Sequence, residues 1–501
     1  MKLFKFNLTL VSFLFISSFA FSQKITGTIS TLADRKISDV ELVAIGDKVI
    51  SIQKATKGRR GVGIDVVQYD MGMNEKKRVS LADEKTSYDE LCMGIKKFNN
   101  KVYVITREDK KSANIIAVEV DPQNLTLSAP KIIAATENEG KKYQYLTAFE
   151  DHTPHFEFTI SPDGHSAGLA IPAFENLFIS ILDENLNVIW GKSNEFKDYH
   201  RIYFEAFSID NNHNAYFGYF VDYRTKLDVK DRYRYAVYTA DSKVIDQGVD
   251  LGGDYVFRMY FVSTKSNGIA VTGGYLDTHS ESNVHGLFTA TLSDKNNFTL
   301  TNIARHPFSE ALLIRANQER WGTTAKKQYG LIKNFTMEAF ELEDGTLDVI
   351  TEFHGSEPMA SVTWRIAGAI MNFHFGKNDS TVSYIPKIRR GQATIGESYH
   401  AFPYKNKMII FYNDNPDNLN NDPSAKTYAS DNYSSTVLVA ATVNENGTFT
   451  RKQAAQKEDA FAAMPELMFE VSENSLMIPL QNIKGLGGIK EGLRFATIKI
   501  E

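Results

Sequence analysis

Closely spaced histidines are the side chains in this sequence best suited to hold a metal ion. His152 and His155 form a His-x-x-His pair directly after Asp151, and neutral imidazoles are common zinc ligands. The pair lies outside any expected helix, and no third ligand can be assigned to it. We therefore expect two hydrogen-bonded histidines in a turn rather than a metal site.

Arginine beside tyrosine marks two further candidates for ligand binding. His200, Arg201 and Tyr203 stand together, and Tyr223 and Arg224 follow on a later loop. A guanidinium and a phenol could stack on a sugar and hydrogen-bond to it, or they could bind a carboxylate. The alternative is a polar rim with local ion pairs.

Acid–base chemistry would need histidines and carboxylates that meet in space. His279 and His285 flank a Ser-Glu-Ser-Asn segment. His354, Glu357 and Trp364 lie on one expected loop of the sixth repeat described below. Glycoside cleavage requires two carboxyl groups about 5 to 10 Å apart, and a sequence cannot place a pair at that distance. We therefore lean against an enzyme and keep a hydrolase or lyase as the alternative.

One acidic loop offers oxygen ligands of the kind that calcium prefers. Asp414, Asp417 and Asp422 lie among asparagines, but their spacing does not follow the alternation of an EF-hand loop. A turn built by Asn and Asp side chains is the simpler interpretation. We expect no cofactor, with calcium at this loop as the alternative.

Sequence motifs with a defined catalytic mechanism are absent. The chain has no Gly-x-Ser-x-Gly turn, no His-Glu-x-x-His, no phosphate-binding loop and no cysteine pair. Its net charge of −5 offers no basic surface for phosphates, so we expect no nucleic-acid partner. Its 501 residues are 43% hydrophobic, which is enough for a large core.

A repeated pattern of short strands and tight turns must position these side chains. In the third repeat, residues 155–160 alternate with period two, a Ser-Pro-Asp-Gly turn follows at 161–164, and three more strands end near residue 190. Eight such units of four strands predict an all-β fold, a single β-propeller. Eight blades are favoured; seven is the alternative, because the spacing between the fifth and sixth units is irregular.

The two ends of the chain predict how the ring closes. The eighth unit stops one strand short at Glu501, and residues 24–31 hold one spare strand. An open blade would leave an unpaired strand edge, so we expect the N-terminal strand to complete the last blade. The propeller then spans residues 24–501, with insertions at 306–336, which should contain a short helix, and at 413–433.

The first 23 residues are typical of a secretory signal peptide, with two lysines, an apolar stretch and small residues before the cleavage site. The apolar stretch is shorter than the roughly 20 residues that span a bilayer, so we expect no transmembrane anchor. The single cysteine, Cys92, lies far downstream of the signal rather than directly after it, so we do not expect a lipoprotein. The protein should reside in the periplasm or outside the cell.

Two stretches resemble known groups of proteins. The turn at residues 161–165 (Ser-Pro-Asp-Gly-His) is similar to blade turns of TolB-type and WD40-like propellers. Residues 384–416, which run from Tyr-Ile-Pro-Lys to Phe-Tyr-Asn-Asp-Asn-Pro, resemble uncharacterised secreted proteins of the Bacteroidetes, as does the Ser-Gln end of the signal. The resemblance implies export in a Gram-negative cell and carries no known activity.

Position on the propeller gives the functional prediction. Function concentrates in long loops on a rigid scaffold, and the long loops expected here connect second to third strands and one blade to the next. We predict a binding or interaction module for a protein or a glycan that acts through this long-loop face, and we expect a monomer. The alternatives are the hydrolase or lyase and a structural component of an envelope assembly.

Overall fold

The computed structural model describes most of the chain between Ile25 and Glu501. The described residues are 25–29, 41–57, 61–82, 92–108, 114–135, 156–173, 176–196, 201–222, 232–266, 268–276, 283–321, 331–332, 335–359, 362–376, 379–391, 398–420, 427–429, 436–455, 461–484 and 488–501. The expected signal peptide, residues 1–23, lies outside them.

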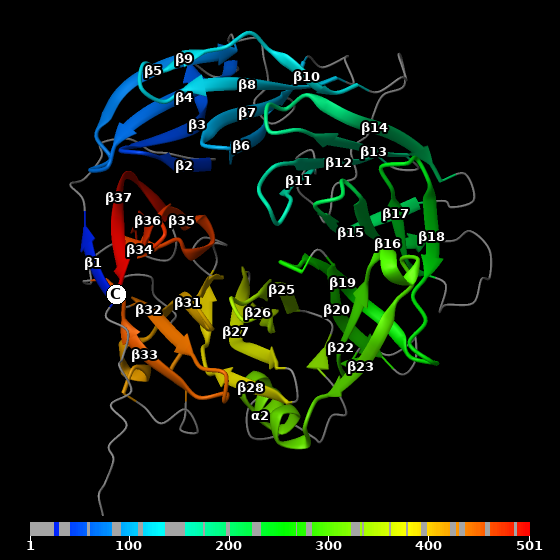
Figure 1. Ribbon diagram of the computed structural model, residues 1–501. Helices are drawn as coiled ribbons and strands as arrows, with labels where there is room; N and C mark the ends of the chain where they lie inside the picture. The colour runs from blue at the N-terminus through cyan, green and yellow to red at the C-terminus, as the bar shows by residue number, and fades with distance from the viewer. Residues whose placement is uncertain are drawn as a thin grey trace, which may run out of the picture.

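Eight antiparallel sheets, each built on four strands, surround a central axis (Figure 1). The chain is therefore an all-β propeller, and the prediction of eight blades rather than seven is confirmed. Consecutive blades follow one another around the ring, and the first strand of each blade lies nearest the axis (Figure 1).

The strands follow the blade order. Blades one to four contain β2 (Glu41–Ile45), β3 (Lys48–Lys57), β4 (Gly61–Asp70) and β5 (Glu75–Ala82); β6 (Cys92–Phe98), β7 (Lys101–Arg107), β8 (Ile115–Asp121), β9 (Thr126–Leu127) and β10 (Lys131–Ala134); β11 (Glu157–Ile160), β12 (Ala167–Ala173), β13 (Asn176–Leu182) and β14 (Val188–Glu195); β15 (Arg201–Ile209), β16 (Ala215–Asp222), β17 (Tyr233–Tyr238) and β18 (Val244–Gly248). Blades five to eight contain β19 (Tyr255–Ser263), β20 (Ile269–Leu276), β22 (Gly286–Leu292) and β23 (Thr301–Pro307); β25 (Phe335–Glu341), β26 (Leu347–Met359), β27 (Val362–Phe375), β28 (Ser380–Ile385) and β29 (Arg389–Gly391); β30 (Tyr399–Tyr404), β31 (Lys407–Asp414), β32 (Val437–Val443) and β33 (Phe449–Gln453); β34 (Phe461–Ala463), β35 (Phe469–Ser472), β36 (Ser475–Lys484), β37 (Gly488–Ile500) and β1 (Ile25–Ile29).

The core of the molecule lies between neighbouring blades. In β7, residues 102–105 are all buried, because a blade packs against a neighbour on both of its faces. In β16, Phe217 and Tyr219 pack toward blade three, whereas Tyr216 packs toward blade five. Packing between blades thus explains the Tyr- and Phe-rich stretch at 216–220.

Several tight turns of this chain begin with an aspartate whose carboxylate accepts hydrogen bonds from amides of the same turn. The Oδ1 atom of Asp183 accepts hydrogen bonds from the amides of Asn185 and Asn187, both at 2.8 Å. Asp70 and Asp210 accept bonds from amides two and four residues later in the same way. Aspartate stabilises turns through such bonds, and these turns, between first and second or third and fourth strands, gather at one end of the ring, the turn end.

The opposite end, the connection end, carries the second-to-third strand loops and the links between blades. The expectation that its loops are all long is wrong, because in blade six β26 and β27 extend over 13 and 14 residues and leave only residues 360–361 between them. His354, Glu357 and Trp364 therefore lie in strands rather than on a loop, and Glu357 pairs with Trp364. Strand pairing continues to the tip of this hairpin, because β27 begins with residues that favour strands.

The ring closes through its N-terminal strand, as predicted. β1 pairs with β37 in antiparallel register from Ile25 opposite Ile500 to Ile29 opposite Ala496. It forms the outer edge of blade eight beside the C-terminus (Figure 1). Ile25 is buried in an apolar cluster that also contains Ile498, so β1 contributes packing as well as backbone hydrogen bonds.

Within the described ranges, one α-helix interrupts the strands. α2 (Glu310–Trp321) follows β23 and buries Leu312 and Leu313 against blade six, where Phe373 lies. A short strand pair, β21 (Asn283–Val284) with β24 (Leu331–Ile332), lies nearby in sequence. The insertions expected at 306–336 and 413–433 begin within β23 and β31, because strand pairing extends further than the sequence indicated. Among the described residues, no helix has the length and apolar character needed to cross a membrane.

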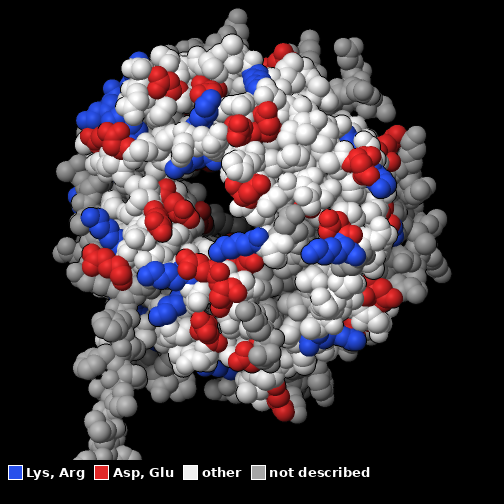
Figure 2. Space-filling view, in the orientation of Figure 1, with Lys and Arg blue, Asp and Glu red and all other residues white. Residues whose placement is uncertain are grey.

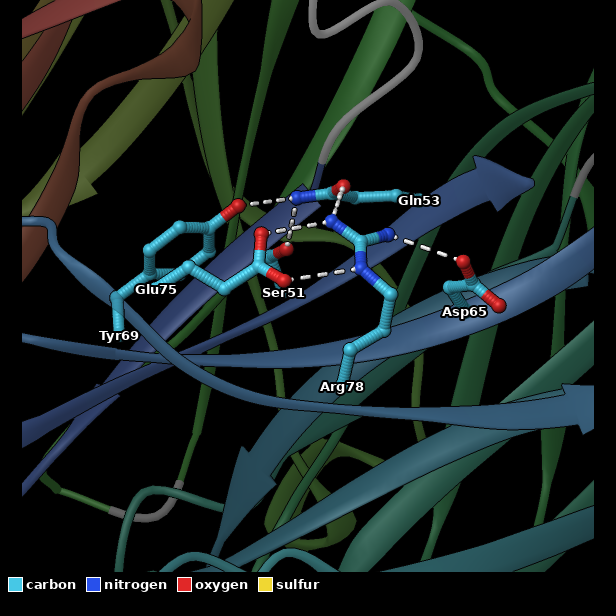
Figure 3. A network of polar contacts seen from close by, with 6 residues as sticks. All are labelled: Ser51, Gln53, Asp65, Tyr69, Glu75 and Arg78. Carbon is cyan, nitrogen blue, oxygen red and sulfur yellow. Dashed lines mark hydrogen bonds and ion pairs between the residues drawn. The ribbon is translucent and has the colours of Figure 1, made fainter. Parts of the chain in front are cut away.

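A polar network lies on the side of blade one that faces blade eight. It comprises Ser51, Gln53, Asp65, Tyr69, Glu75 and Arg78 (Figure 3). The Arg78 guanidinium donates to Glu75 at 2.9 and 3.1 Å, to Asp65 at 3.0 Å and to Gln53 at 3.2 Å. Gln53 donates to Tyr69, which also packs in the apolar cluster shared with blade eight. The network therefore extends the seam at which the ring closes.

Replacing Ile25 with Ala should weaken this seam. Ile25 is 7% exposed, and truncating a buried isoleucine costs about 2 to 5 kcal/mol. As a matched control, Ile132→Ala removes the same atoms from the outermost strand of blade two, where Ile132 is 48% exposed. The control should change the free energy of unfolding by less than about 0.5 kcal/mol. Urea unfolding measures both, and equally small losses would contradict closure through β1.

Candidate functional site

Charged residues lie on the strands that border the central channel. Figure 2 shows an opening at the centre of the ring with acidic and basic side chains around its rim. Glu205 lies on β15, Arg258 and Tyr260 on β19 and Glu338 on β25, which are the first strands of blades four, five and six. We call these four residues the channel cluster.

β-Bulges place two members of the channel cluster. The pairing of β15 with β16 skips Glu205, and the pairing of β19 with β20 skips Arg258. Arg258 has a φ of 57°, a left-handed conformation that costs a non-glycine residue on the order of 1 to 3 kcal/mol. Bulges redirect side chains and are frequent next to active sites, so adjacent blades each present a redirected charged residue near the channel.

Glycine on the partner strand makes room for the bulge of blade five. A Cβ atom on Gly273 would lie 2.2 Å from the carbonyl oxygen of Arg258. In blade four, a Cβ atom on Gly218 would lie 2.9 Å from the Cε atom of Met259. Both distances are shorter than van der Waals contact. The backbone of β19 can therefore lie this close to β20, and Met259 this close to β16, because Gly273 and Gly218 have no side chain.

The carboxyl group of Glu205 is costly to ionise. Burial raises the pKa of Glu205 to about 7, although the charge of Arg258 and a hydrogen bond from the Met259 amide both lower it. Burial also raises the pKa of Tyr260, while Arg258 lowers it and the charges of Glu205 and Glu338 raise it further. The four side chains of the channel cluster are therefore electrostatically connected across three blades.

Glu338 contributes a second carboxyl group that titrates near neutrality. Loss of hydration among the surrounding protein groups raises the pKa of Glu338 to about 7, and the charge of Glu352 adds to the shift. Glu338 nevertheless keeps contact with solvent. A carboxyl group with such a pKa is present in both protonation states at neutral pH, so it could donate or accept a hydrogen bond or a proton.

A buried ion cluster supports the channel wall in blade six. Glu352 is fully buried and contacts the equally buried Lys387 through Oε1, while its Oε2 lies 3.0 Å from His354 Nε2. The Ser398 hydroxyl donates to the same oxygen at 3.0 Å. Burial opposes ionisation of Glu352, but Lys387 and His354 outweigh it and lower the pKa of this carboxyl group. The charge of Lys387 and the hydrogen bond from His354 thus keep Glu352 ionised inside the protein.

A row of aromatic rings lies beside Glu205 on blade four. Tyr203, Phe220 and Tyr233 stand opposite one another on β15, β16 and β17. The ring centroids of Tyr203 and Phe220 are 5.8 Å apart, and those of Phe220 and Tyr233 are 5.0 Å apart. All three rings are half-buried, and the charge of Glu205 raises the pKa of Tyr233 beyond the effect of burial. We call these three residues the aromatic row.

The structure brings two of the predicted site residues into these groups: Tyr203 into the aromatic row and His354 into contact with Glu352. His285 lies apart from them in blade five, half-buried, and its amide donates to the carbonyl of Tyr275. Three other predicted residues are placed by their strands alone, namely Arg201, Glu357 and Trp364. Outside the described residues lie His152, His155, His200, Tyr223, Arg224, His279 and Asp422.

The two described aspartates of the candidate calcium loop have different surroundings. Asp414 is buried at the end of β31, and burial raises its pKa to about 6, while hydrogen bonds from Asn418 and the Asn415 amide lower it. Asp417 is exposed, and its amide donates to the Asn415 side chain. Within the described parts of the chain, no three His, Cys, Asp or Glu side chains gather as a metal site would require.

The sequence interpretation missed Glu205, Arg258, Glu338 and Glu352. A signal for the first two exists, because Phe-Glu-Ala-Phe at 204–207 and Phe-Arg-Met-Tyr at 257–260 interrupt the apolar alternation at the same place in two repeats. A charged residue inside an otherwise apolar inner strand indicates a bulge. Glu352 gave no such signal, because its partners Lys387 and Ser398 are far away in the sequence.

Comparisons with known proteins give no family for this chain. No protein-family model and no curated protein match it. Among solved structures, the Dos1 propeller is 8% identical at a TM-score of 0.43, covering 95% of this chain and 95% of that one. An ulvan lyase of polysaccharide lyase family PL25 is 9% identical at a TM-score of 0.38, covering 80% and 90%. A duf4221 family member from Bacteroides vulgatus is 12% identical at a TM-score of 0.35, covering 84% and 95%. Likenesses at this level carry no argument about activity.

Replacing Gly273 with Ala should destroy the bulge of blade five. The new methyl group would overlap the Arg258 carbonyl oxygen, and forced overpacking costs about 1 to 3 kcal/mol. Gly191→Ala is the matched control, because a Cβ atom there would meet its nearest neighbour at 3.7 Å. Denaturant unfolding of both variants measures the difference. A Gly273→Ala protein as stable as the control would show that the bulge does not depend on this glycine.

Replacing Glu205 with Gln should stabilise the protein at pH 8 more than at pH 5. Because the pKa of Glu205 is raised to about 7 in the folded state, the folded state holds this proton more tightly than the unfolded chain. Its contribution to the free energy of unfolding therefore falls as pH rises from about 4.5 to 7. Glutamine has no such proton, so the gain at pH 8 should be about 1 to 3 kcal/mol. Urea unfolding at both pH values checks this, and equal differences at the two would contradict it.

Proposed function

We propose that this protein is exported and acts as a binding module for a protein or a glycan, which it engages at the connection end of the ring and the adjoining channel wall. The signal-like residues 1–23 and the resemblance to secreted Bacteroidetes proteins support export to the periplasm or the cell exterior of a Gram-negative bacterium. Recovery of mature protein that begins at Lys24 would test this part.

The contrast between the two ends of the ring carries the proposal. At the turn end, aspartates such as Asp70 and Asp183 bond to amides of their own turns, and hydrogen bonds lower their pKa against the effect of burial. Glu205 and Glu338 instead have raised pKa values, and Arg258 is held in a strained conformation. Carboxyl groups with shifted pKa values and residues with strained backbone conformations are typical of functional sites.

The position of the aromatic row assigns it to the connection end. Tyr203 is the third residue of β15, which enters blade four from that end, and Tyr233 is the first residue of β17, which returns from it. Aromatic rings with polar tips suit interfaces that are partly wet. The aromatic row and the channel cluster together offer apolar area, donors and acceptors within one region of the ring.

A second candidate function is supported by one observation. Glu205 and Glu338 both have a pKa of about 7, which suits general acid–base catalysis near neutral pH. A hydrolase or lyase that acts on polysaccharide or peptide would use such groups. Turnover of a bound ligand by the purified protein, lost in both Glu205→Gln and Glu338→Gln, would favour this function over binding alone.

Binding of the mature protein to glycan and peptide arrays tests the proposed function. Glu338→Lys places a bulky opposite charge in the channel wall and should weaken binding at least about tenfold, which corresponds to about 1.4 kcal/mol. Glu343→Lys is the matched control, because Glu343 is also exposed but lies five residues later in a turn at the opposite end. Equal loss in both variants, or loss in the control alone, would contradict binding at the connection end.

A further inference from the structure

We propose that the aromatic row and the neighbouring Glu205–Arg258 pair bind one neutral pyranose ring of a glycan. The sugar would pack its C–H surface between the rings of Tyr203 and Phe220, whose centroids are 5.8 Å apart at an interplanar angle of 45°, and direct its hydroxyl groups toward Glu205 and Arg258. This inference rests on the proposed function and specifies the ligand class for the same end of the ring.

The aromatic row lies where the packing between blades four and five gives way to solvent. Tyr216 and Tyr235, on the same face of the blade, are 1% exposed and belong to the core between these blades. Tyr233 packs against that core but is only half-buried, as are Tyr203 and Phe220. The row therefore continues the core outward as a surface of ring carbon atoms. A pyranose has one relatively apolar C–H surface, which such rings can cover.

Glu205 and Arg258 supply the polar half of the site. The charge of Glu205 acts on Tyr233, and its carboxyl group accepts a hydrogen bond from the Met259 amide of blade five. Glu205 therefore lies between the aromatic row and β19. The guanidinium of Arg258 offers five N–H donors and a carboxylate offers several acceptor positions. Sugar hydroxyl groups both donate and accept, so they can bond to both partners at once.

The two bulges hold these polar groups before a ligand arrives. Glu205 and Arg258 are the residues that strand pairing skips, and the carbonyl oxygen of Arg258 lies against Gly273 of the neighbouring strand. Groups that are fixed in advance lose less conformational entropy on binding. A hydrophilic ligand such as a sugar gains most from such a site, because its hydrogen bonds to the protein only replace bonds to water.

Charge selects a neutral sugar over an acidic one. At pH 8, above the pKa of about 7 of both Glu205 and Glu338, these two carboxylates and the Arg258 guanidinium give the channel cluster a net negative charge. A uronic acid would meet two carboxyl groups and one guanidinium. A carboxylate ligand would also raise the already raised pKa values of both glutamates. A neutral hexose or pentose avoids this repulsion while it uses the same donors and acceptors.

Titration calorimetry of the mature protein at pH 8 with cellotetraose, xylotetraose, mannotetraose and tetragalacturonate tests the inference. At least one neutral tetrasaccharide should bind, and tetragalacturonate should bind at least about tenfold more weakly. Tyr203→Ala should weaken the neutral sugar at least about tenfold, because the ring surface is lost, and Tyr203→Phe should weaken it less than about threefold. Phe220→Leu, which keeps apolar volume but loses the ring, provides a second variant should Tyr203→Ala fail to fold.

The outcomes separate this inference from the proposed function. If neutral sugars bind equally well to wild type, Tyr203→Ala and Phe220→Leu, the site lies elsewhere and the inference fails while a glycan-binding module stands. If only peptides bind and Glu338→Lys abolishes that binding, the ligand class is wrong and the binding module again stands. Stronger binding of tetragalacturonate overturns the preference for neutral sugar. If no glycan or peptide binds, both proposals fail.

Discussion

Every blade of this ring has two apolar faces, and each face must be covered by a neighbouring blade. This requirement makes closure the constraint on which the rest of the structure depends. Blade eight can cover blade one only as a complete sheet, and its outer strand comes from the opposite end of the chain, where Ile25 pairs with Ile500. The polar network around Arg78 extends the contact between these two blades. Closure thus joins the first and last segments of the sequence in one sheet.

A closed ring of blades leaves little freedom for placing polar groups. Side chains of the inner strands alternate between two crowded interfaces, and a charged residue in either one would lose its hydration. Bulges at Glu205 and Arg258 take these two residues out of that alternation, and Gly273 on the partner strand leaves space for the bulge at Arg258. The raised pKa of Glu205 and the left-handed conformation of Arg258 show that this arrangement has a cost. Ring packing tolerates it because the neighbouring cores fix both strands.

The two ends of the ring use similar residues in different ways. The aspartates at the turn end accept hydrogen bonds from amides of their own turns. Their hydrogen-bonding partners are therefore local, and the turns that they stabilise end the strands. The carboxyl groups of Glu205 and Glu352 depend instead on partners from another blade or a distant segment, and the pKa of Glu338 is raised by burial and by the charge of Glu352. Interactions of the first kind make the scaffold. Interactions of the second kind leave groups with unusual proton affinity beside half-buried aromatic rings, which is why the proposed ligand is placed there.

Period-two strands and Asp-containing turns are local features, so the sequence by itself determined the all-β class, the eight units and the spare strand at 24–31. It also placed Tyr203 and His354 among the candidate site residues, and their roles stay predictions. Only the tertiary structure decided that Glu205 approaches Arg258 and that Glu352 contacts Lys387, since these pairs come from separate blades or distant segments. A bulge shifts every later side chain by one position, and in blade five the bulge at Arg258 packs against Gly273 of the neighbouring strand. No local pattern specifies that contact.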